Sequence, residues 1–90
     1  MPSLRIPTPL RTYTDGQSEV EVAGGTVTEA MQDLVSRYPA LQPHLYNGEN
    51  QLRPFVNLFL GENNTRDLQG FETPLNKGDT LRIIPSIAGG

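Results

Sequence analysis

Few groups in this chain of 90 residues could carry out covalent chemistry. The sequence contains no cysteine, which excludes disulfides, thiolate metal sites and cysteine nucleophiles. Its single histidine, His44, has no second histidine with which to share a metal ion and no nucleophile at a recognisable spacing. We therefore expect His44 to be a surface or loop residue. The remaining candidate is the C-terminal carboxylate, which belongs to Gly90.

The carboxylate of Gly90 follows a second glycine, Gly89. A C-terminal carboxylate has a pKa of about 3.3 to 3.7, so it is ionised near neutral pH and can act as a nucleophile. Glycine has no Cβ, so a narrow channel of another protein could close around this backbone. The residues after Pro85 could extend about 16 to 18 Å. On the two glycines alone, an ordinary frayed chain end would be the simpler interpretation.

Composition and charge exclude several classes of protein. Ninety residues are enough for one small domain. Seven basic and ten acidic residues give a net charge of 7 − 10 = −3, and neither sign is clustered, which disfavours nucleic-acid binding. No apolar run is long enough for a signal peptide or a membrane span. The sequence therefore predicts a cytoplasmic protein without nucleic-acid or membrane partners.

Two strands and a helix are expected in the first half of the chain. Leu4 and Ile6 alternate with polar residues, as do Val20 and Val22, and the Asp15-Gly16 pair predicts a turn between these strands. We expect the two strands to form a hairpin. The second strand ends at the Gly24-Gly25 pair.

The helix is expected to begin after Thr26, because Thr26 and Glu29 have the spacing of a capping box. It should end near Tyr38, before Pro39. Its apolar residues recur with helical spacing and predict one stripe that faces a sheet, formed by Val27, Ala30, Met31, Leu34, Val35 and Tyr38.

The second half of the chain is expected to contribute three strands. Residues 40–54 show no regular pattern, although Leu41 and Leu45 should pack against the core. Residues 55–60 alternate strongly and predict a strand, whereas 61–64 predict a turn. A short strand at 65–68 and a final strand at 80–85 should follow. The fold class is therefore α+β, with one main helix covering one face of a mixed sheet.

This order of elements resembles the ubiquitin-like β-grasp sulfur carriers of the MoaD/ThiS family over nearly the whole chain. The most specific shared features are the Lys77-Gly78-Asp79 turn, the Phe55-Val56-Asn57 opening of the middle strand, and the ending Ile83-Ile84-Pro85-Ser86-Ile87-Ala88-Gly89-Gly90. The resemblance implies a β-grasp domain at 1–85 and a flexible tail at 86–90. Carriers that supply a cysteine synthase are the most similar, on the segments Ile6–Arg11, Arg53–Asn57 and Arg66-Asp67.

The resemblance also implies a chemical route for Gly90. A ubiquitin-activating-type enzyme would adenylate the carboxylate with its own ATP, and a sulfurtransferase would supply the sulfur that converts it to a thiocarboxylate. The carrier would not itself be an enzyme and would bind no cofactor. A cysteine synthase-like enzyme would then accept the sulfur. Two alternatives stay open, namely the small subunit of molybdopterin synthase, acting with its large subunit, and a ubiquitin-like protein modifier.

A partner-binding surface is expected beside the tail. If the middle strand turns Val56 towards the helix, Phe55 and Phe59 lie on the open face of the sheet, beside Arg82 and Ile84 of the final strand. Together with the tail residues Ser86, Ile87 and Ala88, these four side chains are the candidate docking residues. An equally weighted alternative is that the segment from Leu41 to Gln51 folds over the two aromatic rings as a second small core.

Overall fold

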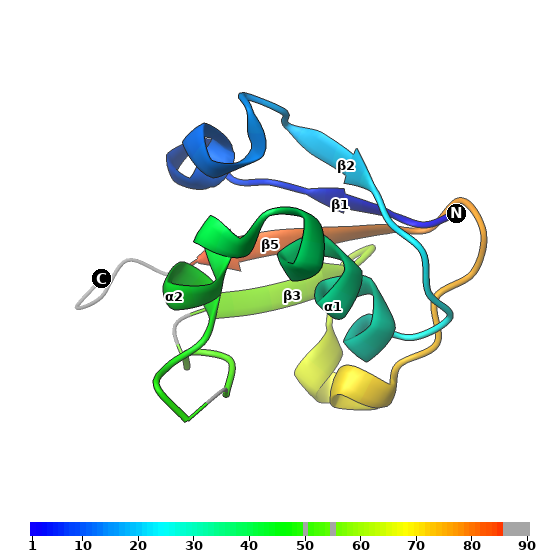
Figure 1. The fold of residues 1–90 in the computed structure, drawn as a ribbon. Helices are drawn as coiled ribbons and strands as arrows, with labels where there is room; N and C mark the ends of the chain where they lie inside the picture. The colour runs from blue at the N-terminus through cyan, green and yellow to red at the C-terminus, as the bar shows by residue number, and fades with distance from the viewer. Residues whose placement is uncertain (50, 55, 86–90) are drawn as a thin grey trace.

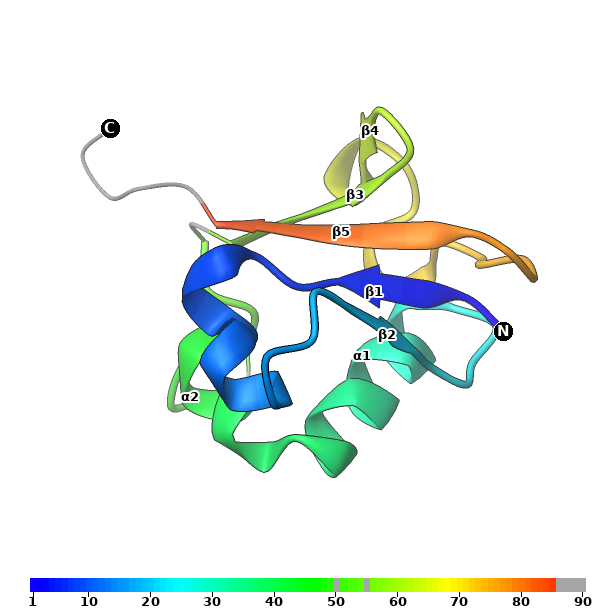
Figure 2. The ribbon, with the colours of Figure 1, turned by 90° about the horizontal axis from the view of Figure 1, so that it is seen from above.

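A single mixed sheet with helices on one face forms the body of the protein. The computed structural model describes residues 1–49, 51–54 and 56–85. Its strands follow the order β2-β1-β5-β3-β4, and α1 and α2 lie on the same side of the sheet (Figures 1 and 2). The strands are β1 (Ser3–Arg5), β2 (Glu19–Glu21), β3 (Val56–Leu60), β4 (Asn63–Asn64) and β5 (Thr80–Pro85). The predicted α+β, β-grasp arrangement is confirmed.

The last strand of the chain occupies the centre of the sheet. On one side β5 runs parallel to β1, with Leu4 opposite Leu81. On the other side it runs antiparallel to β3, where Val56 lies opposite Pro85. Since β1 also pairs with β2 in antiparallel fashion, the predicted pairing of the first two strands is correct. The two strands are joined by a 3-10 helix at Thr8–Thr14 rather than by a tight turn alone.

Helix α1 (Val27–Arg37) begins and ends where the sequence predicts. The Thr26 side chain accepts a hydrogen bond from the Glu29 amide at 3.3 Å. The Glu29 carboxylate reaches back to the amide of Gly25 at 2.6 Å, one residue before the position expected in a capping box. Both side chains therefore satisfy backbone N–H groups at the helix start, which would otherwise lack partners.

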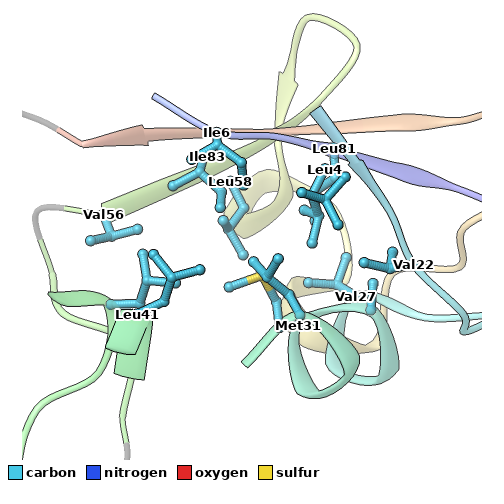
Figure 3. Packing of buried hydrophobic residues seen from close by; sticks show 14 of the residues in the cluster. Leu4, Ile6, Val22, Val27, Met31, Leu41, Val56, Leu58, Leu81 and Ile83 are labelled. Carbon is cyan, nitrogen blue, oxygen red and sulfur yellow. The ribbon is translucent and has the colours of Figure 1, made fainter. Parts of the chain in front are cut away.

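One apolar cluster fills the space between the helices and the sheet (Figure 3). Val27 and Met31 of α1 meet Leu4 and Leu81 from the sheet, and all four side chains are buried. Within the predicted stripe, Val35 and Tyr38 are only partly buried. The alternation predicted for β3 is also confirmed, because Val56 and Leu58 face this core while Asn57 and Phe59 face away.

A second helix covers the part of the core that α1 does not reach, which corrects the expectation of irregular structure at 40–54. A 3-10 turn at Pro39–Leu41 leads into α2 (Gln42–Leu45). Leu41 and Leu45 are fully buried, as predicted. Four residues are too few for a helix to be stable alone, so α2 depends on the burial of these two leucines.

The short strand predicted at 65–68 is also wrong. Thr65–Asp67 forms a 3-10 turn, and β4 lies two residues earlier, within the segment expected to be a turn. The Asn64 side chain accepts a hydrogen bond from the Arg66 amide at 3.0 Å, and the Thr65 side chain is buried. Local side-chain bonding of this kind competes with extension of a strand.

Gly24 offers a test of how closely the chain approaches the start of α1. Its φ is +145°, and an added Cβ would lie 2.7 Å from Glu29 Cβ and 2.9 Å from the Ala30 amide nitrogen. We expect Gly24→Ala to lower the free energy of unfolding by about 1–3 kcal/mol, measured by chemical denaturation.

Gly25→Ala is the matched control. A Cβ at Gly25 would meet only the Glu29 carboxylate oxygen, at 3.6 Å, and the Gly25 amide would keep its hydrogen bond. Its expected effect is within about 0.5 kcal/mol. If the two substitutions lowered the free energy of unfolding equally, the close contact at Gly24 would not be the cause of the loss.

Candidate functional site

The open face of the sheet brings together three of the four predicted docking side chains. Phe59 and Arg82 lie directly opposite each other in neighbouring strands, and Ile84 lies opposite Asn57. Arg82 is exposed, Ile84 is 37% exposed and Phe59 is partly buried. Phe55 lies outside the described residues, as do Ser86, Ile87, Ala88, Gly89 and Gly90.

Arg82 is held in place at the centre of this face. Its guanidinium donates a hydrogen bond to the Gly61 carbonyl at 2.7 Å, and its central carbon lies 5.8 Å from the centroid of the Phe59 ring. A guanidinium over an aromatic face is attracted by the ring's electron density. The pair therefore presents a partner with a flat apolar surface beside a positive charge.

The side chains of Asn64 and Arg66 also lie in this region, although the sequence analysis did not select them as docking residues. The Asn64 side chain donates a hydrogen bond to the Asn57 side-chain oxygen at 3.2 Å, and Arg66 donates to the Val56 carbonyl at 3.1 Å. The alternation of β3 already placed Asn57 on the open face. The position of Arg66 could not be inferred, because it depends on the 3-10 turn at 65–67.

The described residues contradict the alternative in which Leu41 to Gln51 folds over the two aromatic rings, because the leucines of this segment pack on the helix side; Phe55 lies outside the described residues. Leu41 and Leu45 pack in the cluster between helices and sheet, and Leu52 also contacts that cluster. The Tyr46–Leu52 bridge closes the loop on the same side. The apolar side chains of the sheet point towards the helices, so Leu41 and Leu45 pack against them there rather than on the open face.

A groove of about 420 Å³ lies on the helix side of the molecule, between α1, α2 and the exposed ring of Phe71. Its lining is uncharged and mixes apolar side chains such as Met31 and Val35 with polar ones such as Gln32. Burial raises the pKa of the Tyr46 hydroxyl, so this group remains neutral near neutral pH. The groove therefore offers no pair of charged groups for acid–base chemistry.

The described residues hold no other reactive constellation. No group of three or more histidine or acidic side chains among them could bind a metal ion, and no helix among them is long and apolar enough to cross a bilayer. His44 is exposed on α2 and stacks on Tyr13, with ring centroids 4.3 Å apart. This agrees with the surface position predicted for it.

Comparisons with known proteins identify the family. The model described as the ThiS family matches residues 4–90. The sulfur carrier protein CysO of Mycobacterium tuberculosis is 32% identical over 90 residues, which cover 98% of this chain and 97% of that protein.

Solved structures give the same result. A chain of the Amycolatopsis orientalis BexX/CysO complex has a TM-score of 0.88 and 38% identity, with 100% of both chains covered. The small archaeal modifier protein 1 of Methanosarcina acetivorans has a TM-score of 0.88 and 27% identity, covering 99% of this chain and 95% of that one. The chain therefore belongs to the ThiS family and is a homologue of proteins named as sulfur carriers.

Proposed function

We propose that this protein is a sulfur carrier whose Gly90 carboxylate is converted to a thiocarboxylate by partner enzymes. The observation that carries the proposal is the similarity to sulfur carrier protein CysO over nearly the full length of both chains. The absence of cysteine from the sequence supports it, because no side chain here could carry sulfur as a thiol or persulfide. The terminal carboxylate is then the natural attachment point.

The proposed chemistry takes place in two steps on a partner. A carboxylate oxygen of Gly90 attacks the α-phosphate of ATP, pyrophosphate leaves, and an acyl-adenylate forms. A sulfur nucleophile then attacks the acyl carbon and AMP leaves, so that the carboxylate becomes a thiocarboxylate when the nucleophile is sulfide. ATP is bound by the activating enzyme in this scheme, and the carrier acts as its substrate.

The folded body supports this role by presenting the tail from a rigid strand. Pro85 is the last residue of β5, which pairs with β1 through Arg82 and with β3 as far as Pro85. A central strand is harder to displace than an edge strand, because two ladders must be broken. The body can therefore dock through the open face while the tail residues enter the partner. We propose a cysteine synthase-like enzyme as the acceptor of the sulfur.

A role as a protein modifier is the second candidate. The small archaeal modifier protein 3 of Haloferax volcanii is 29% identical over 65 residues, which cover 72% of this chain. In that case the activated Gly90 would be transferred to a lysine amine of a target protein. The same adenylate serves both outcomes, so the nucleophile that attacks it decides between them.

The first test is the intact mass of the protein after incubation with ATP, sulfide and an activating enzyme of this family. We expect a mass gain equal to the replacement of one oxygen by sulfur. A variant lacking Gly89 and Gly90 is the control and should show no gain. An equal gain in the truncated variant, or covalent adducts to other proteins in place of the sulfur product, would contradict the carrier role.

The open face should matter for loading rather than for folding. Phe59→Ala removes the ring beneath Arg82, so we expect the KM of the activating enzyme for the carrier to rise about tenfold, which corresponds to about 1.4 kcal/mol of binding free energy. The kcat should change little, because the tail is intact. The variant should remain folded by circular dichroism.

Phe71→Ala is the matched control, since it removes another partly exposed ring from the helix side. We expect it to leave KM unchanged. If Phe71→Ala raised KM and Phe59→Ala did not, the activating enzyme would dock at the groove between α1 and α2. Loss of folding in Phe59→Ala would assign the ring a role in the core instead.

A further inference from the structure

The arginines of this protein fall into groups that differ in how their charge is used. Arg5 pairs with Glu19 at 3.6 Å, and Arg37 pairs with Asp33 at 3.1 Å. Arg11, Arg53 and Arg66 make no ion pair with any carboxylate in the described part of the chain. Each of these three bonds instead to main-chain carbonyl oxygens, so its positive charge is not neutralised. We call them the tail-end arginines; Arg82 bonds to a main-chain carbonyl in the same way, but lies on the open face.

The tail-end arginines are anchored around the end of β5. Arg66 donates hydrogen bonds to the carbonyls of Pro54 and Val56 at 3.2 and 3.1 Å. Val56 is the residue paired with Pro85, which is the last residue of β5. This guanidinium therefore lies beside the strand ends from which the chain continues into residues 86–90.

The other two arginines lie on the remaining sides of the same end. Arg11 donates to the Ile6 carbonyl at 3.0 Å. Ile6 directly follows β1, and because β1 and β5 run in parallel, their C-terminal ends lie on the same side of the sheet. Arg53 donates to the Pro43 carbonyl in α2 at 3.0 Å. In both ribbon views, the 3-10 helix that contains Arg11, the helix α2 and the end of β5 lie on one side of the molecule (Figures 1 and 2).

Four of the ten acidic side chains have partners away from these arginines. Glu19 and Asp33 pair with other arginines, Glu29 binds the Gly25 amide, and Asp79 binds the Asn76 amide at 2.8 Å. Asp67, although next to Arg66 in the sequence, forms no ion pair with it in the described structure. A chain with net charge −3 thus presents unneutralised positive charge where the tail leaves the body.

Anchoring on carbonyls prepares these side chains for a second interaction. A guanidinium has five N–H donors in a fixed plane, and the carbonyl bonds described above use one donor nitrogen on each arginine. The carbonyl restricts the side chain without cancelling its charge, so less conformational entropy is lost when an anion binds. Carboxylates match the planar fork of arginine particularly well.

We propose that the tail-end arginines dock on the activating enzyme, against a carboxylate-rich rim around the site that receives the tail. This inference rests on the proposed function and adds the chemistry of the partner's surface. Charge complementarity at this rim would raise the rate of productive encounter and orient the tail towards the opening. A protein partner is favoured over nucleic acid, because the chain is acidic overall.

The test measures loading of the carrier by its activating enzyme at several salt concentrations. We compare the wild type with Arg11→Gln, Arg53→Gln and Arg66→Gln, singly and combined, and with Lys77→Gln as the matched control. Lys77 lies in the turn before β5, at the opposite end of that strand. We expect the combined variant to raise KM by about tenfold or more at low salt, with kcat nearly unchanged.

The salt dependence separates docking from a purely structural role. Raising the salt concentration should increase the KM of the wild type and of Lys77→Gln, while the combined variant should respond much less. Arg66→Lys, which keeps the charge, should stay closer to the wild type than Arg66→Gln. A wild-type KM that does not depend on salt overturns the proposal even if the combined variant fails to fold.

The two proposals fail in different ways. If the wild type is loaded with sulfur but the glutamine variants and Lys77→Gln share its KM, the docking role is overturned and the carrier role stands. If no sulfur is gained by the wild type, the carrier role fails, and the docking inference fails with it. An equal rise in KM from Lys77→Gln would show that only net charge matters and would also overturn the proposal.

Discussion

The pairing of β5 with β1 and β3 is the constraint on which the rest of the structure depends. The strand nearest the C-terminus is inserted between two strands formed earlier in the chain, in parallel to one and antiparallel to the other. Leu81 and Ile83 then meet the side chains of both halves in one core. Until β5 is in place, neither half has a complete apolar face to bury, so the two halves are expected to fold together.

This arrangement divides the sheet into two faces with different roles. The face that carries Leu4, Leu58 and Leu81 is covered by α1 and α2 and supplies the stability of the domain. The other face keeps Phe59 beneath Arg82 and leaves Ile84 partly exposed. Core-facing and outward-facing side chains alternate along each strand. The strands that build the core therefore also set the spacing of the side chains on the docking face.

Chemistry and folding are separated along the chain in the same way. The proposed reactive carboxylate belongs to Gly90, which follows β5 in the sequence, and the surfaces proposed for docking belong to the described body. The arginines illustrate the division, because Arg37 pairs with Asp33 within α1 and donates to the Glu21 carbonyl of β2, whereas Arg66 holds its charge at the strand ends beside Pro85. The ion pair of Arg37 with Asp33 holds that side chain within the fold, whereas Arg66, which forms no ion pair in the described structure, remains available to a partner.

The sequence by itself determined the elements whose signals are local. Thr26 and Glu29 set the start of α1, Pro39 set its end, and alternation determined which side chains of β3 and β5 face the core. Tertiary structure decided α2, the 3-10 turn at Thr65–Asp67, and the carbonyls that anchor Arg11, Arg53 and Arg66. The reason is physical. A four-residue helix is not stable alone, and a single hydrogen bond contributes little, so neither requires a recognisable pattern in the local sequence. The short helix is stabilised by the burial of Leu41 and Leu45 in the core.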